Sequence, residues 1–239
     1  MLYILIYNKK MILLNNIKQK MSQEYILPSE GDFLEGGVDE SNRGGLIYDV
    51  VAACVVLPND ITMYPDDKYK QIKDSKKLTP KKRAELAEYI KNIAITYGIG
   101  TASNIEIDDT NILCATMKAM HRAINEAYKK KAFNNLLIDG PHFNVYVPPG
   151  IDKEPLPHQC VIKGDAKHLN IAAASIVAKD YHDTMFLKLI DENPELEKYD
   201  LRKNQGYGTA RHLEAIKKYG ITKFHRKTFG PCKIAIYNS

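Results

Sequence analysis

Two acidic residues stand side by side in the run GGVDESNRGG, which begins at Gly36 and leads into a glycine-rich turn with one arginine. Asp39 and Glu40 lie between a short apolar step and the strongly apolar stretch 50–57. That position predicts that they lie where a core strand ends. Carboxylates in such a place destabilise the fold unless a cation or hydrogen bonds compensate them. Taken alone, the run also fits a solvated turn with two acids.

Two later segments repeat this arrangement of an apolar run that leads to an aspartate. Residues 136–138 lead into Asp139, and residues 160–164 lead into Asp165. Neighbouring strands of one sheet can gather carboxylates at their ends, where like charges raise one another's pKa values unless divalent cations neutralise them. The pattern contains no metal-spaced His or Cys, so it favours Mg²⁺ or Mn²⁺ over zinc. Such a site suits two-metal phosphoryl hydrolysis.

An alternation of strands and helices is predicted to position these acids. In chain order, the expected elements are a buried strand over 46–57, a helix from the N-cap Thr79 to Gly98, a strand over 99–107, a helix from Asp108 and Asp109 to Lys131, and helices over 170–190 and 209–219. The predicted inward face of the second helix comprises Leu113, Met117, Met120, Ile124 and Ala127. Residues 141–158 contain five prolines and predict a loop. The alternation indicates α/β layering.

The composition is that of a protein with a sizeable core. The 239 residues include 34 basic and 29 acidic ones, and the net charge of +5 is compatible with a nucleic acid partner without requiring one. Four widely spaced cysteines indicate reduced core residues rather than disulfides or a zinc site. No stretch has the length of a membrane span and the opening is a poor signal peptide, so we expect an intracellular, cytoplasmic protein with no membrane partner. Residues 1–21 are expected to form a dispensable, disordered leader.

Seven short blocks, taken together and in order, resemble the signature of the ribonuclease HII family, the type 2 ribonucleases H. They are GVDESNRG from position 37, DSKKLT from 74, LIDG from 137, KGD from 163, AAASIVAK from 172, GYGT from 206 and HRKTF from 225. The resemblance implies a ribonuclease H-like mixed sheet flanked by helices, with a small helical C-terminal extension. It divides the chain into the leader, a catalytic domain over 22–205 and a substrate-contacting extension over 206–239.

By this resemblance, Asp39, Glu40, Asp139 and Asp165 match the family's four catalytic carboxylates and bind two divalent ions, Mg²⁺ or Mn²⁺. Adjacent residues of a regular strand face opposite ways. Asp39 and Glu40 can therefore share a site only if the strand ends or bulges there.

The resemblance also implies which residues contact the substrate. In the family, the backbone of a Gly-Arg-Gly turn senses the ribose 2′-hydroxyl together with the tyrosine of the GYGT block, and these positions are Asn42, Arg43, Gly44 and Tyr207 here. Lys76 and Lys77 resemble phosphate-contacting positions, although a solvated charge run would look the same. A basic set near the C-terminus is expected to follow a duplex backbone: Lys217, Lys218, Lys223, His225, Arg226 and Lys227.

Three features depart from the family pattern. Asn42 stands in place of the first glycine of the turn, and Gly45 in place of the usual following proline. Asparagine tolerates a left-handed backbone, so we expect recognition by the turn to survive. The interval from Asp139 to Asp165 is longer than in typical bacterial members, which predicts an enlarged loop beside the cleft.

The resemblance implies a metal-dependent endonuclease, acting as a monomer on RNA/DNA hybrids and on duplex DNA that contains ribonucleotides. It would hydrolyse the RNA strand, or cut 5′ of an embedded ribonucleotide, and leave 5′-phosphate and 3′-hydroxyl ends. One alternative is a hybrid-only ribonuclease H without activity on single ribonucleotides. Another is a non-catalytic hybrid-binding module, which the four carboxylates disfavour. A metabolic enzyme would need a small-molecule pocket motif that the sequence does not show.

Overall fold

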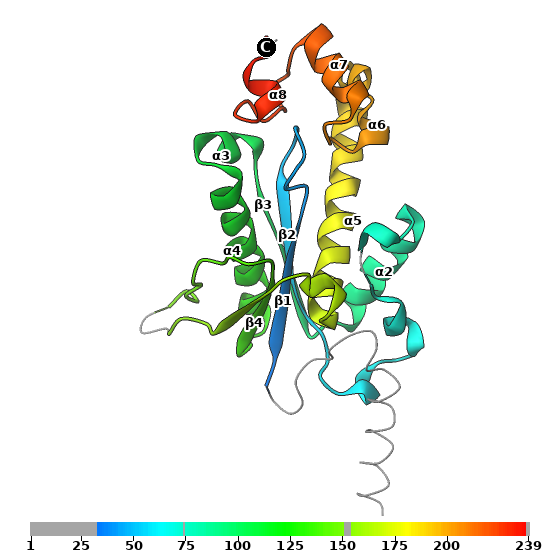
Figure 1. Cartoon of the computed structure of the whole chain (residues 1–239). Coiled ribbons are helices and arrows are strands. Elements are labelled where there is room, and N and C mark those ends of the chain that lie inside the picture. The colour runs from blue at the N-terminus through cyan, green and yellow to red at the C-terminus, as the bar shows by residue number, and fades with distance from the viewer. Residues whose placement is uncertain (1–32, 74, 151–153, 238–239) are drawn as a thin grey trace, which may run out of the picture.

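A single mixed β-sheet organises the fold of the computed structural model, which describes residues 33–73, 75–150 and 154–237. The strand order is β3-β2-β1-β4-β5, in which β2 is antiparallel to its neighbours β1 and β3, and β4 is parallel to its neighbours β1 and β5 (Figure 1). The strands are β1 Glu35–Ser41, β2 Val50–Val56, β3 Thr96–Ala102, β4 Asn135–Asp139 and β5 His158–Val161. The predicted mixed sheet is confirmed. The predicted leader, residues 1–21, and Asp74 of the second block lie outside the described residues.

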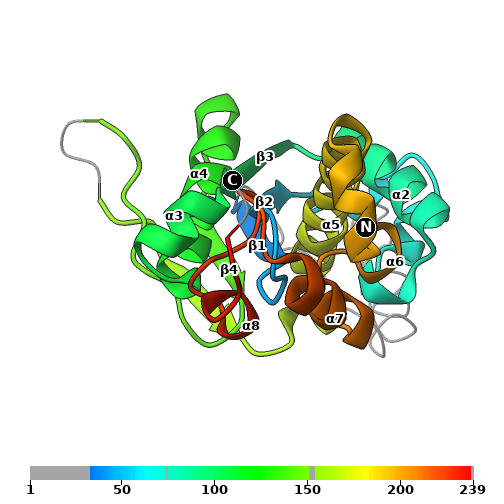
Figure 2. The same cartoon turned by 90° about the horizontal axis from the view of Figure 1, so that it is seen from above.

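Helices cover both faces of the sheet (Figure 2). One face carries α3 Asn104–Asp109 and α4 Ile112–Lys130, and the other carries α2 Pro80–Ile93 and α5 Leu169–Glu192. Strand β2 is buried along its whole length, and its alternate residues enter two different apolar cores. Val50, Ala52 and Cys54 pack with the α4 core, whereas Val51 and Ala53 pack with the α5 core. This two-sided burial explains why β2 is apolar throughout rather than alternating.

Helix α5 lies close against β1 because Gly37 has no side chain. A Cβ at Gly37 would stand 2.2 Å from the backbone carbon of Asn170 in the first turn of α5. The Asn170 side chain also links β1 to the residue that follows β2, since its Nδ2 donates to the Glu35 carbonyl at 2.7 Å and its Oδ1 accepts from the Leu57 amide at 3.1 Å. These contacts fix α5 over the strand that carries Asp39.

The segment between α2 and α4 differs from its prediction. Thr79 caps α2 as expected, but the helix ends at Ile93, and Gly98 belongs to β3. Gly98 is needed for close packing, since a Cβ there would lie 2.2 Å from the Ala123 carbonyl of α4. The predicted strand over 99–107 is also wrong beyond Ala102, because Ser103 begins helix α3 with a reciprocal capping box to Glu106.

The second long helix begins later than predicted. Its N-cap is Asn111 rather than Asp108 or Asp109, and it ends at Lys130. The Asp108 carboxylate instead accepts the backbone N–H groups of Lys227 and Thr228, both at 2.9 Å. Of the five residues predicted to form the inward face of α4, four are buried, whereas Leu113 is exposed.

The C-terminal part of the chain lies across one end of the sheet (Figure 1). Its helices α7 Ala210–Tyr219 and α8 Gly230–Lys233 enclose a third apolar core with Leu46, Ile47 and the end of α5. An isolated β-bridge joins Ile47 to His225. The remaining short helices are η1 Ile61–Met63, η2 Asp67–Gln71, η3 Ser75–Lys77, η4 Gly164–Ala166, η5 Pro194–Tyr199 and α6 Leu201–Asn204. Among the described residues, no helix is long and apolar enough to cross a membrane. The boundaries of the three predicted domains stay a prediction.

Candidate active site

Asp39 and Asp139 lie beside each other on neighbouring parallel strands. The register pairs Val38 of β1 with Ile138 of β4, so the next residue of each strand is one of these aspartates. Gly37 of β1 packs on Asn170 of α5, and Leu137 of β4 packs on Ile171 of α5. Residues two positions apart on a strand face the same side of the sheet, so Asp39 and Asp139 also project toward α5. The expected convergence of two strand-borne acids is therefore present.

Asp39 is buried, with 5% of its surface exposed. Burial, followed by repulsion from Glu40 and from Asp139, raises the pKa of Asp39 well above its usual value. Its carboxylate is partly compensated by the Glu40 amide, which donates to Oδ1 at 2.7 Å, and by a hydrogen bond with the Ser175 side chain of α5. Ser175 is in turn held at 2.9 Å from the Ser75 hydroxyl of η3.

Glu40 reaches the site by a route other than the expected bulge. Strand β1 keeps its regular antiparallel register through Glu40 and ends at Ser41, so the acidic pair lies at the end of a core strand as predicted, but there is no bulge. Glu40 begins on the opposite face of the sheet from Asp39, but β4 has ended at Asp139 and leaves the sheet edge open there. Burial raises the pKa of Glu40; Arg43, 3.5 Å away, opposes that rise, and Asp139 adds to it.

Asp165 lies in the turn that follows β5. The preceding residue, Gly164, donates its amide to Asp139 Oδ1 at 2.6 Å, which ties this turn to the end of β4. A Cβ at Gly164 would lie 2.5 Å from Ile171 Cδ1, so glycine lets the turn approach α5. Asp165 is half-buried in η4 beside that contact.

The carboxylates suit a hard divalent cation by their donor type and by their uncompensated charge. All four predicted ligands supply oxygen atoms, and a cation would relieve the repulsion that raises the pKa of Asp39. Among the described residues, however, no three His, Cys, Asp or Glu side chains are grouped closely enough to hold one ion. Charge interactions link Asp39, Glu40 and Asp139, whereas Asp165 lies in the adjoining turn. Their shared role as metal ligands stays a prediction.

The predicted substrate turn lies against Tyr207. A Cβ at Gly44 would stand 3.7 Å from Tyr207 Cε1, so the ring and the turn are close neighbours. Asn42 adopts the left-handed backbone conformation, with φ of 64°, as its residue type allows. Its buried side chain points away from solvent and donates to the carbonyls of Ile47 at 3.1 Å and Asp49 at 2.9 Å. The Asn42 side chain therefore stabilises the turn from the interior of the protein.

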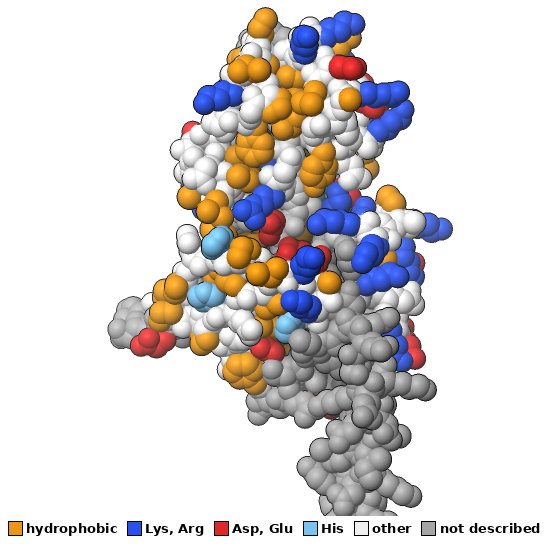
Figure 3. All heavy atoms as spheres, in the orientation of Figure 1, with side chains coloured by type: hydrophobic (Ala, Val, Ile, Leu, Met, Phe, Trp, Pro, Cys, Tyr) orange, Lys and Arg blue, Asp and Glu red, His pale blue; other side chains and the backbone are white. Residues whose placement is uncertain are grey.

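Lys76 and Lys77 are both exposed in η3, directly after the buried Ser75. Two interactions anchor this segment to α2 and α5: Arg83 donates to the Ser75 carbonyl at 3.0 Å and pairs with Asp183 at 2.8 Å. On the face drawn in Figure 3, acidic side chains gather near the centre and Lys and Arg side chains surround them. This charge arrangement suits a polyanion that approaches a cation-requiring centre.

Two members of the predicted basic set do not face solvent. His225 and Arg226 are completely buried, so the expectation that they follow a duplex backbone is wrong. Their polar atoms are used inside the protein, mostly on backbone groups. The four lysines of the set, Lys217, Lys218, Lys223 and Lys227, are all exposed.

Ser175 is the site residue that sequence reasoning passed over. It is the single hydroxyl in the otherwise apolar helix run from Ala172 to Ala178. A lone polar side chain on a buried helix face requires a partner, and that signal could have directed attention to it.

Comparisons with known proteins agree with this geometry. A family model described as Ribonuclease HII matches residues 36–232. The Ribonuclease HII of Bacteroides thetaiotaomicron is 44% identical over 198 residues, covering 83% of this chain and 90% of that protein. The crystal structure of ribonuclease H2 from Pyrococcus horikoshii superposes with a TM-score of 0.66 at 23% identity, covering 84% of this chain and 96% of the other.

A second solved structure, Bst-RNase HIII in complex with Mn²⁺, has a TM-score of 0.60 at 18% identity and covers 85% of this chain and 69% of that one. The likeness to both structures concerns the fold. The family match and the sequence identity also decide against a non-catalytic binding module. The chain therefore belongs to the ribonuclease HII family, and it is an endonuclease that acts on RNA/DNA hybrids.

Proposed function

We propose that the chain hydrolyses the RNA strand of hybrids, and cuts 5′ of single ribonucleotides in duplex DNA, with two divalent ions held by Asp39, Glu40, Asp139 and Asp165. The observation that carries the proposal is the register of β1 and β4, which sets Asp39 beside Asp139, together with the hydrogen bond from the Gly164 amide that ties the turn of Asp165 to Asp139. The Mn²⁺ complex of the related-fold protein Bst-RNase HIII supports the choice of Mg²⁺ or Mn²⁺. Bound ions would supply an activated water and stabilise the leaving oxygen, which gives 5′-phosphate and 3′-hydroxyl ends.

The protein's own groups prepare the carboxylates for that role. The Ser175 hydroxyl and the Glu40 amide hold the Asp39 carboxylate in one orientation. The Gly164 amide does the same for Asp139. Exposed Lys76 and Lys77, with Arg43, would contact the phosphates on either side of the scissile bond.

Selection of a single ribonucleotide would use the turn 42–44 and Tyr207. Among the described residues, the amides of Arg43 and Gly44 donate to no protein acceptor, so they are available to a ribose hydroxyl. Tyr207, with 38% of its surface exposed, can pack its ring on the same sugar. The 2′-hydroxyl is the group that distinguishes RNA from DNA at one nucleotide.

The test measures cleavage of two substrates, a long RNA/DNA hybrid and a DNA duplex with one ribonucleotide, with Mg²⁺, with Mn²⁺ and in excess chelator. We expect cleavage of both substrates with either metal and none with chelator. Hybrid cleavage without single-ribonucleotide cleavage would establish the hybrid-only alternative. Full-rate cleavage in chelator would refute the metal assignment.

The active form is proposed to be a cytoplasmic monomer. The four carboxylates and the turn 42–44 with Tyr207 all come from one chain, which supports a monomer. The four cysteines are all free, as in a reducing compartment. Light scattering during size-exclusion chromatography tests the monomer, since a dimer would double the measured mass.

A further inference from the structure

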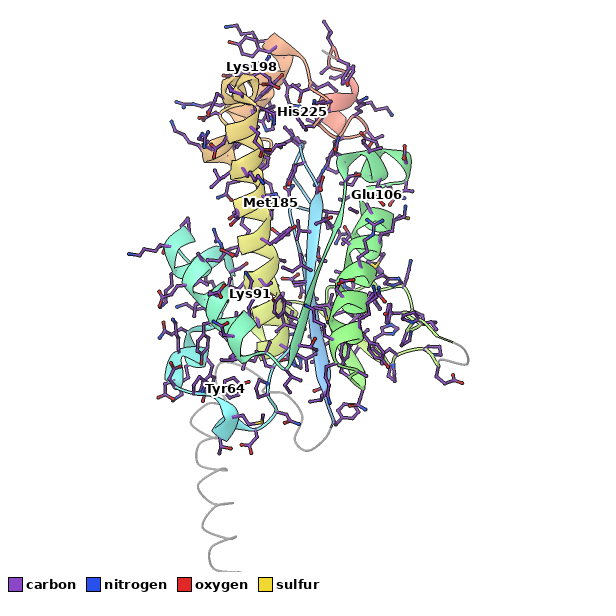
Figure 4. All side chains as sticks on the ribbon, turned by 180° about the vertical axis from the view of Figure 1, so that it is seen from behind. Tyr64, Lys91, Glu106, Met185, Lys198 and His225 are labelled. Carbon is purple, nitrogen blue, oxygen red and sulfur yellow. The ribbon has the colours of Figure 1, made fainter. Side chains whose placement is uncertain are left out.

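His225 and Arg226 are consecutive residues with no exposed surface, in a segment where polar side chains normally face solvent. Figure 4 shows His225 where the C-terminal part of the chain meets the end of the sheet. The bridge from His225 to Ile47 places the pair directly behind the turn 42–45. With no exposed surface, neither side chain can contact a phosphate of a substrate, so their polar groups must act inside the protein.

The Arg226 guanidinium is surrounded by backbone carbonyls of the turn. Nη2 donates to the Asn42 carbonyl at 2.8 Å. Nη1 donates to the carbonyls of Arg43 at 3.1 Å and Gly45 at 2.7 Å, and Nε donates to the backbone carbonyl of Tyr48 at 2.9 Å. Three carbonyls of the turn 42–45 and the carbonyl of Tyr48 thus converge on a single planar fork of donors, which no other side chain offers. With its carbonyls held inward, the turn has the amides of Arg43 and Gly44 left for a ligand.

His225 acts on Tyr207 through a second histidine. The Thr222 amide donates to His225 Nδ1 at 3.1 Å, so that nitrogen carries no proton. A neutral His225 therefore carries its proton on Nε2, which lies 3.3 Å from His212 Nε2. His212 must accept there, so its own proton is on Nδ1, 3.0 Å from the Tyr207 carbonyl.

Both histidines are neutral in this arrangement. Burial, with a smaller contribution from His212, lowers the pKa of His225 to about 3. Burial also lowers the pKa of His212. Each ring therefore keeps one defined tautomer at neutral pH, and the chain of donors runs in one direction from Thr222 to Tyr207.

We propose that the buried His225–Arg226 pair is a positioning element that fixes the turn 42–45 and Tyr207 at the spacing needed to read one ribose 2′-hydroxyl. Arg226 holds the turn and His225, through His212, holds the backbone of Tyr207. This inference rests on the proposed reading of the ribose by those two elements. Neither residue touches the substrate, so neither is catalytic. A purely structural pair would support folding without affecting the choice of substrate.

The first experiment compares kcat/KM on the single-ribonucleotide duplex with kcat/KM on the uniform hybrid. The variants are Arg226→Lys and, as the matched control, Arg202→Lys, the same change at an exposed arginine that pairs with Asp191 and Glu197. Because one ammonium cannot reach four carbonyls, we expect Arg226→Lys to lower the ratio of the two values about tenfold or more, given how strongly small misplacements affect rates. The control should leave the ratio unchanged. An unchanged ratio in folded Arg226→Lys would overturn the role of Arg226.

The second experiment does not depend on the stability of an Arg226 variant. An asparagine at 212 can place its Nδ2–H near the position of His212 Nδ1 and still donate to Tyr207, whereas glutamine extends past that position. We therefore expect His212→Asn to keep most of the substrate ratio and His212→Gln to lower it severalfold. Equal ratios in the two variants would overturn the histidine chain.

Nitrogen-15 NMR of the wild type reads the tautomers directly. We expect the Nδ1–H form for His212 and the Nε2–H form for His225 at neutral pH, and the opposite pattern at either ring contradicts the chain. If Tyr207→Ala lowers the substrate ratio while the Arg226 and His212 variants do not, the positioning role fails and the proposed function stands. A wild type that ignores the single ribonucleotide overturns both.

Discussion

Two neighbouring regions of this molecule are built in opposite ways. The acidic cluster of Asp39, Glu40, Asp139 and Asp165 lies at strand ends and in the adjoining turn, and three of its members repel one another. The ribose-reading region, which comprises the turn 42–45 and Tyr207, is tied by hydrogen bonds from buried C-terminal side chains. The first region retains unfavourable charge that a cation can use, whereas the backbone of the second is held by hydrogen bonds within the protein. In the proposed mechanism, metal binding would relieve the repulsion in the first region, whereas selection of a ribose would depend on the fixed spacing in the second.

The largest expected effect breaks the acidic cluster. Asp39→Asn or Asp139→Asn should lower cleavage of the hybrid by about a thousandfold or more, since both metal binding and charge are lost. The free variant should be at least as stable as the wild type, because a repelling charge has been removed. Steady-state cleavage and thermal unfolding without metal test both parts. Full-rate cleavage in either variant would remove that residue from the site.

The same contrast predicts how stability depends on pH. Burial raises the pKa of Asp49, behind the turn, to about 6, and raises that of Asp39 well above normal. An aspartate with a raised folded pKa stabilises the protein below its unfolded pKa, and this contribution is lost as the pH rises through the folded value. For Asp49 the window runs from about pH 4 to about pH 6, and the loss at neutral pH is about 3 kcal/mol.

Urea unfolding of metal-free protein across this range measures the effect. Compared with the wild type, Asp49→Asn should gain relative stability between pH 4 and pH 6, and Asp39→Asn should likewise gain it as the pH rises above the ordinary aspartate value. A difference from the wild type that stays constant with pH would show that the replaced carboxyl does not titrate as stated.

Tyr207→Ala sharpens the comparison at the other region. Cleavage of the single-ribonucleotide duplex should fall about tenfold or more while hybrid cleavage falls less, because a hybrid offers many 2′-hydroxyls and the duplex offers one. The acidic cluster is unchanged in this variant, so metal dependence should be that of the wild type. Equal losses on the two substrates would assign Tyr207 to general binding.

The sequence predicted the acidic cluster better than the ribose-reading region, for a physical reason. Asp39 and Asp139 each follow an apolar run, and sheet alternation then determines the face on which they lie. The burial of Arg226 has no such local sign, because the four carbonyls that it meets are about 180 residues away in the chain. Without knowledge of those partners, a charged residue among other basic residues looks like a surface residue.

The departures from the family pattern at Asn42 and Gly45 also became intelligible only in three dimensions. The left-handed conformation of Asn42 followed from its residue type, but the position of its side chain did not. A Cβ at Gly45 would lie 2.0 Å from Asn42 Oδ1, so the two departures compensate each other. Replacing Asn42 by glycine would remove the two hydrogen bonds that the Asn42 amide donates to the carbonyls of Ile47 and Asp49.

The smallest predicted effect is the coupling between these two positions. Gly45→Ala should lower the free energy of unfolding by about 2 kcal/mol in the wild type, as overpacking of a filled site does. The same change in an Asn42→Gly background should have little effect, so a double-mutant cycle should give a coupling of about 1 kcal/mol or more. Gly44→Ala is the matched control for stability, because a Cβ there meets only Tyr207 Cε1, at 3.7 Å. Urea unfolding of the four cycle members measures the coupling. If Gly45→Ala is equally destabilising with and without the Asn42 side chain, the backbone of Gly45 and not the neighbouring amide requires glycine, and the two departures arose independently.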